Sequence, residues 1–99
     1  MQLTIGKFVK DGPDFDGRLA MLTFQENAMI LPTRGRRGNS APDYRVYANG
    51  VQIGEARRAS DKRGRLCLSV LLDDPVFLQP IVCKLVEDGF LSYRLVWSR

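Results

Sequence analysis

The stretch YRVYANGVQIGEA, residues 44–56, indicates the fold class of this chain. Two alternating runs of apolar and polar residues flank Asn49-Gly50. Asn-Gly favours a type I′ turn, because both central residues of that turn need a positive φ. The stretch therefore predicts a β-hairpin with strands over 44–48 and 51–56. Side chains alternate along a strand, so Tyr44 and Tyr47 are expected on opposite faces.

Similar alternation extends to both sides of this hairpin and predicts strands near residues 3–10, 15–24, 28–31, 66–72 and 91–97. Turn residues separate them, as in Asp11-Gly12-Pro13-Asp14 and Glu87-Asp88-Gly89. Gly17 lies inside a strand pattern and suggests a bulge or a close backbone approach. Residues 81–86 fit a strand or a short helix, and the surroundings favour a strand.

The 99 residues are enough for one core only, so we expect a single domain over residues 1–99. Its predicted architecture is all-β: a small antiparallel sandwich or partly open barrel of six to eight short strands. At most one short helical turn is expected, at 76–79, where Asp74 could act as N-cap ahead of Pro75.

Positive charge is concentrated between Arg34 and Arg65. This stretch holds nine of the fifteen Lys and Arg residues against three acids, a net charge of +6. The rest of the chain holds six bases against eight acids, a net charge of −2. A concentrated positive field attracts polyanions, so the asymmetry points to a binding surface.

The predicted hairpin brings this charge together in space. The residues before its first strand and after its second lie at the same end, so the loops near 34–37 and 57–65 are expected to be neighbours, with the Asn49-Gly50 turn at the far end. Tyr44 or Tyr47 could stack on a base beside Arg45. The candidate nucleic-acid-binding residues are Arg34, Arg36, Arg37, Arg45, Tyr47, Arg57, Arg58, Lys62, Arg63 and Arg65.

Catalysis is not predicted. The chain has no His, which removes the usual general base, and it shows no phosphate loop or nucleophile elbow. Asp73 and Asp74 precede a Pro and are interpreted as a strand stop and a turn cap. Cys67 and Cys83 lie in apolar runs and are expected to be free, buried thiols. No metal site and no cofactor are expected.

Several segments together resemble the bacterial domain-of-unknown-function family 736. They include Phe15-Asp16-Gly17, residues 41–46 (APDYRV), residues 68–77 (LSVLLDDPVF) and the closing Leu95-Val96-Trp97-Ser98-Arg99. The resemblance covers nearly the whole chain. It implies a small cytoplasmic protein common on bacterial plasmids and integrated mobile elements, and it implies no chemistry.

The expected function is binding without catalysis, and two partners stay open. The first is nucleic acid, contacted through its backbone by the Arg-rich loops. The alternative is a protein module that docks through its basic surface on an acidic face of a host complex, for example as an inhibitor of a defence system such as a CRISPR effector. The N-terminus shows no secretory signal and no apolar run could span a bilayer, so a cytoplasmic protein without membrane contact is expected. It would be a monomer or a homodimer paired through edge strands.

Overall fold

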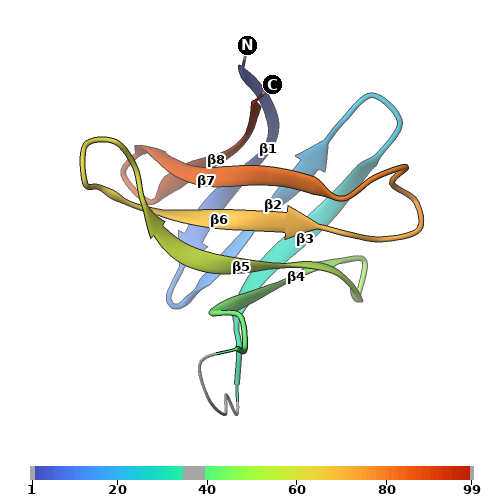
Figure 1. The fold of residues 1–99 in the computed structure, drawn as a ribbon, viewed down its shortest axis with the longest axis horizontal. Coiled ribbons are helices and arrows are strands. Elements are labelled where there is room, and N and C mark those ends of the chain that lie inside the picture. Colours follow the sequence, from blue (N-terminus) through green and yellow to red (C-terminus); the bar gives the residue numbers. More distant parts are fainter. Residues whose placement is uncertain (1, 35–39, 99) are drawn as a thin grey trace.

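The computed structural model describes residues 2–34 and 40–98, and it is a barrel of eight antiparallel strands (Figure 1). In chain order the strands are β1 (Gln2–Asp11), β2 (Asp14–Ala20), β3 (Gln25–Pro32), β4 (Tyr44–Ala48), β5 (Val51–Ser60), β6 (Leu66–Leu72), β7 (Ile81–Gly89) and β8 (Ser92–Ser98). The all-β prediction is confirmed. Within the described ranges no helix is long and apolar enough to cross a membrane.

Each strand pairs with its neighbours in sequence, and β1 pairs with β8 to close the ring. The sheet is therefore a closed barrel, where the sequence predicted a sandwich or a partly open barrel. A closed ring leaves no unpaired strand edge among the described residues. A homodimer paired through edge strands therefore has no free edge to use. Whether the protein is a monomer or a dimer stays a prediction.

The interior of the barrel is filled by apolar side chains, as in other small eight-stranded barrels. Leu19, Ile30, Val70 and Leu72 are completely buried, and no buried residue is polar or charged among those described. At one end the rings of Phe15, Tyr44 and Tyr93 pack edge to face, with centroids 5.9 Å and 5.0 Å from Phe15. This packing leaves the outer surface as the place for function.

Strand boundaries show where the sequence analysis was right. Asn49 and Gly50 have φ values of 52° and 79°, which confirms the predicted turn. Residues 81–86 are confirmed as strand, within β7. The prediction for 74–79 is confirmed only as a hydrogen-bonded turn: the Phe77 N–H donates to the Asp74 carbonyl, and no helix forms.

Three predicted boundaries are wrong. The loop predicted over 57–65 is shorter, because β5 continues through Arg57 and Arg58 to Ser60, where it pairs with β6. The second strand ends at Ala20, because Met21 and Phe24 bond to each other's backbone and turn the chain. Residues 87–89 are not a turn: β7 continues through a bulge between Glu87 and Gly89, and Phe90 and Leu91 make the turn. Leu91 adopts a φ of 57°, which is unusual for a residue other than glycine.

Gly17 marks a close approach between β1 and β2, as predicted. A Cβ at this position would lie 2.0 Å from the Lys7 carbonyl oxygen and 2.7 Å from the Phe8 Cα. Phe8 is 2% exposed and lies directly opposite Gly17 in the ladder. The glycine therefore makes room for the Phe8 ring inside the barrel.

The up-and-down order gives the barrel two different ends. One end carries the loops β1–β2, β3–β4, β5–β6 and β7–β8, and we call it the basic end. The other carries both chain termini and the loops β2–β3, β4–β5 and β6–β7, and we call it the apolar end (Figure 1). The Arg-rich loops and the Asn49-Gly50 turn thus lie at opposite ends, as predicted.

Candidate nucleic-acid interface

The β3–β4 loop and the end of β5 are in direct contact at the basic end. The Arg57 guanidinium donates hydrogen bonds to the backbone oxygens of Ser40 (2.7 Å) and Ala41 (3.2 Å). The Arg58 N–H donates to the Asp43 carboxylate at 2.8 Å, and the two side chains form an ion pair at 3.7 Å. The predicted proximity of the two loops is confirmed for their described parts.

Through these contacts Arg57 and Arg58 hold the β3–β4 loop against β5. Arg58 also stacks over the Tyr44 ring, 5.4 Å from its centroid. Both guanidinium groups remain exposed, so both add to the local positive field. Tyr44 is buried against Phe15 and is not available to a base, whereas Tyr47 lies half-buried on the outer face.

The β5–β6 loop is organised by Asp61. Its carboxylate accepts hydrogen bonds from the backbone N–H groups of Arg63 (2.8 Å) and Arg65 (2.9 Å) and from the Arg65 side chain at 3.1 Å. The Arg65 N–H in particular, with that of Arg63, lowers the pKa of Asp61 below its ordinary value. Lys62 and Arg63 are exposed at the tip, and their side chains form no ion pair with the described residues.

The remaining predicted residues divide into two groups. Arg34, Arg45 and Tyr47 line a shallow depression over β3 and β4, but Arg45 is half-buried directly opposite Glu55. Arg36 and Arg37 lie outside the described residues. Arg34, at the start of the β3–β4 loop, is exposed.

A second set of cations, which the sequence pattern did not indicate, lies on the outer wall. Lys7 on β1 lies directly opposite Arg94 on β8 and directly opposite Arg18 on β2. We call Arg94, Lys7 and Arg18 the basic ladder. Arg94 donates to the Thr4 hydroxyl and Arg18 to the Asn27 side-chain oxygen, and both partners are uncharged. No ladder residue joins an ion pair with another described residue.

Lys84 continues this surface onto β7, where Ser69 and Val96 lie opposite it. Four consecutive strands around the ring, β7, β8, β1 and β2, thus each present one cation on the outer wall. No composition count finds them, because they come from positions 7, 18, 84 and 94 in the part of the chain with a net negative charge. The sequence showed only that each of these residues lies in an alternating strand. The pairing register between the strands is needed to see that they lie side by side.

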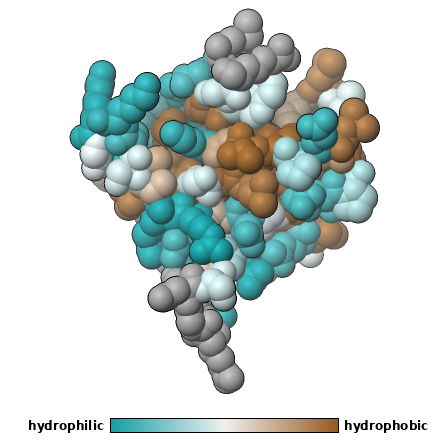
Figure 2. All heavy atoms as spheres, viewed as in Figure 1, coloured by the Kyte–Doolittle hydropathy of each residue, from teal (hydrophilic) through white to brown (hydrophobic). Residues whose placement is uncertain are grey.

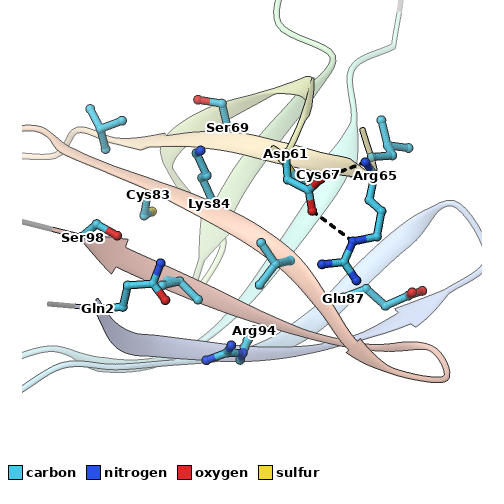
Figure 3. Close-up of a pocket in the computed structure, with 14 residues that line it drawn as sticks. Gln2, Asp61, Arg65, Cys67, Ser69, Cys83, Lys84, Glu87, Arg94 and Ser98 are labelled. Carbon is cyan, nitrogen blue, oxygen red and sulfur yellow. Dashed lines mark hydrogen bonds and ion pairs between the residues drawn. The ribbon is translucent and has the colours of Figure 1, made fainter. Parts of the chain in front are cut away.

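A groove of about 550 Å³ runs over the outer face of β6, β7 and β8 beside the ladder. Figure 3 shows Arg65 and Glu87 near one end of it, Lys84 and Arg94 on its two sides, and Gln2 and Ser98 near the other end. Its carboxylates are Asp61, which Arg65 engages, and Glu87. The groove therefore holds three cations and two carboxylates, a net charge of +1, beside uncharged hydrogen-bonding groups and apolar side chains. Lys84 and Arg94, which form no ion pair with a described acid, are the cations there that a phosphate chain would contact.

Figure 2 shows the contrast between the two ends. Hydrophilic side chains project at the left, where the β5–β6 loop lies, and hydrophobic ones at the upper right, where the β2–β3 and β6–β7 loops lie. The exposed apolar residues there include Leu22 and Leu78. Exposed hydrophobic side chains therefore gather at the apolar end.

Residues 2–34 and 40–98 contain no group of three or more His, Cys, Asp or Glu residues that could hold a metal ion. Cys67 and Cys83 are free and buried, which confirms the prediction for both thiols. Burial raises the pKa of Cys83 to about 12, so this thiol stays protonated and unreactive at neutral pH.

Comparison with known proteins adds a family and no activity. No curated protein and no solved structure matches this chain. A family model described as "Protein of unknown function (DUF736)" matches residues 4–99, nearly the full length. The chain therefore belongs to the DUF736 family, as the sequence segments indicated.

Proposed function

We propose that this barrel is a nucleic-acid-binding protein of a bacterial mobile element or phage, acting without catalysis. The basic ladder, Lys84 and the exposed cations of the Arg-rich loops would contact the phosphate backbone. Contacts of this kind fix position and carry little sequence information. Binding would be weakly sequence-specific and steeply dependent on salt.

The observation that supports this proposal best is the ladder itself. Like charges directly opposite each other in an antiparallel sheet destabilise it. Lys7 has a cation opposite it on both sides, and no described acid forms an ion pair with any of the three. A polyanion lying across β8, β1 and β2 would remove this repulsion and release its own counterions.

The test is fluorescence anisotropy of labelled oligonucleotides at low salt with two charge-neutralising variants. Arg94→Gln changes the ladder. Arg45→Gln makes the same change of charge on β4, on the opposite wall, without placing two carboxylates opposite each other at Glu55. We expect Arg94→Gln to weaken binding far more than Arg45→Gln. Equal losses would point to net charge alone, and absence of binding by the unaltered protein would refute the proposal.

Protein docking is the second candidate function, and the apolar end favours it. Leu22 and Leu78 are fully exposed, and a hollow of about 520 Å³ lies between Leu3, Met21 and Ile81. An apolar segment of a host complex, such as a CRISPR effector, would fit there. Leu22→Asp with Leu78→Asp should abolish such docking and leave oligonucleotide binding intact.

A further inference from the structure

Phe90 is an aromatic side chain that does not pack into the core of the barrel. It lies in the two-residue turn between β7 and β8, and 92% of its surface is exposed. The other eight aromatic residues are buried or half-buried. A ring of this size on a turn normally gains stability only by packing, and in the described structure Phe90 takes part in no ring contact.

Charges of both signs surround Phe90: the exposed Glu87 and Asp88 precede it in the chain, and cations lie on a neighbouring loop. Its turn lies at the same end of the barrel as the β5–β6 loop, and the two loops are neighbours because β6 pairs with β7 (Figure 1). That loop carries Lys62, Arg63 and Arg65. The groove begins beside the turn, at Glu87 and Arg65, and continues past Arg94 and Lys84 (Figure 3).

An exposed ring three residues beyond Glu87, which lines one end of a groove with three cations, suits a ligand that carries both phosphates and bases. Cations track a phosphate chain, and an aromatic ring offers a face on which an unpaired base can stack. In a duplex the bases are paired and stacked on one another, so the ring would find no partner there. We propose that the groove binds single-stranded nucleic acid, with phosphates near Arg65, Arg94 and Lys84 and one base stacked on Phe90.

This inference rests on the proposed function and narrows it from nucleic acid to single strands. It differs from the stacking role considered for Tyr47, which is half-buried on β4, on the opposite wall of the barrel. Phe90 is almost fully exposed and takes part in no ring contact with the described residues, so its replacement is expected to leave the fold intact. Thermal unfolding of each variant checks that expectation.

The experiment measures anisotropy of three labelled 12-residue probes in 50 mM salt. The probes are oligothymidine, the same length of abasic deoxyribose phosphate, and a 12-base-pair duplex. The proteins are the unaltered chain, Phe90→Ala, Phe90→Leu and Phe90→Tyr. Leu keeps an apolar side chain without a ring, and Tyr keeps the ring.

We expect Ala and Leu to weaken oligothymidine binding roughly five-fold or more, the usual loss of one stacked base, and Tyr to preserve it. None of the three should alter binding of the abasic probe or the duplex. Duplex binding as tight as oligothymidine binding, or an unchanged affinity of Phe90→Ala for oligothymidine, would overturn this inference and leave the proposed function standing. No binding of any probe would overturn both.

Discussion

Lys7 should be a residue whose loss makes the protein more stable and a poorer binder. It lies between Arg94 and Arg18 in the ladder, and neither of these is in an ion pair with a described acid. Lys7→Gln removes the central charge and keeps a long polar side chain. Lys84→Gln is the matched control, since it removes a cation from the same wall where Ser69 and Val96 lie opposite.

The expected gain follows from Coulomb's law. Two charges about 8 Å apart in water repel by about 0.5 kcal/mol, so two neighbours contribute about 1 kcal/mol. At 0.1 M salt the Debye length of about 10 Å leaves roughly half of this, and at 1 M salt almost nothing remains. We therefore expect Lys7→Gln to raise the free energy of unfolding by about 0.5 kcal/mol at 0.1 M salt. For a domain of this size that raises Tm by about 2–4 °C.

Calorimetry or circular dichroism melts in 0.1 M and 1 M NaCl measure the gain for both variants. Two results would contradict charge repulsion in the ladder: a Tm of Lys7→Gln no higher than that of Lys84→Gln in 0.1 M NaCl, or a difference between them that persists in 1 M NaCl. In binding, each variant loses one phosphate neighbour, so the slope of log K against log salt should become shallower by about 0.7 for a single strand. Opposite signs for stability and affinity in one variant cannot arise from misfolding.

Three further predictions concern the barrel and its loops. Gly17→Ala should destabilise the fold by about 3 kcal/mol or more in denaturant unfolding, because its Cβ would overlap the backbone of Lys7 and Phe8, and a smaller loss would mean that β1 and β2 can separate cheaply. The depressed pKa of Asp61 means that its carboxylate stabilises the loop above about pH 4, and this contribution disappears as pH falls through the folded pKa. The Tm of Asp61→Asn should therefore lie below that of the unaltered protein at pH 6, and the difference should shrink as the pH is lowered below about 4. The Cys83 thiol should resist iodoacetamide at pH 8 in the folded protein and react after unfolding, whereas rapid labelling of native protein would show that β6 and β7 open locally.

The sequence was most informative where a local rule determines the structure. Asn49-Gly50 predicted a turn with two positive φ values, and Gly17 predicted a close backbone approach, because each depends on a few neighbouring atoms. It was less informative where strands end. Residues 87–89 look like a turn by composition, but a bulge lets β7 continue, and Leu91 accepts a left-handed φ instead.

Closure of the barrel was beyond the reach of local rules. The pairing of β1 with β8 joins residues about 90 positions apart in sequence, such as Lys7 and Arg94. No pattern within either strand indicates this partner, which is why a partly open barrel remained possible from the sequence. The same limit applies to the candidate site. The predicted loops lie together as expected, but Arg94 joins Lys7 and Arg18 in the ladder only because the ring closes.

The closed ring also explains why a domain of 99 residues can be stable with so many cations on its surface. The cations of the ladder stand on strands whose other face packs into a core without buried polar residues, so each strand is anchored independently of its outer side chains. Repulsion of about 1 kcal/mol is small beside the burial of Phe8 and Leu95 from β1 and β8, since each such side chain contributes about 1.5–3 kcal/mol. Apolar burial on the inner face can therefore stabilise the β1–β8 pairing even though the cations on the outer face repel one another. A partner that neutralises that outer face would also strengthen this pairing, so ligand binding should protect the β1 and β8 amides from hydrogen exchange more than those of β4 and β5.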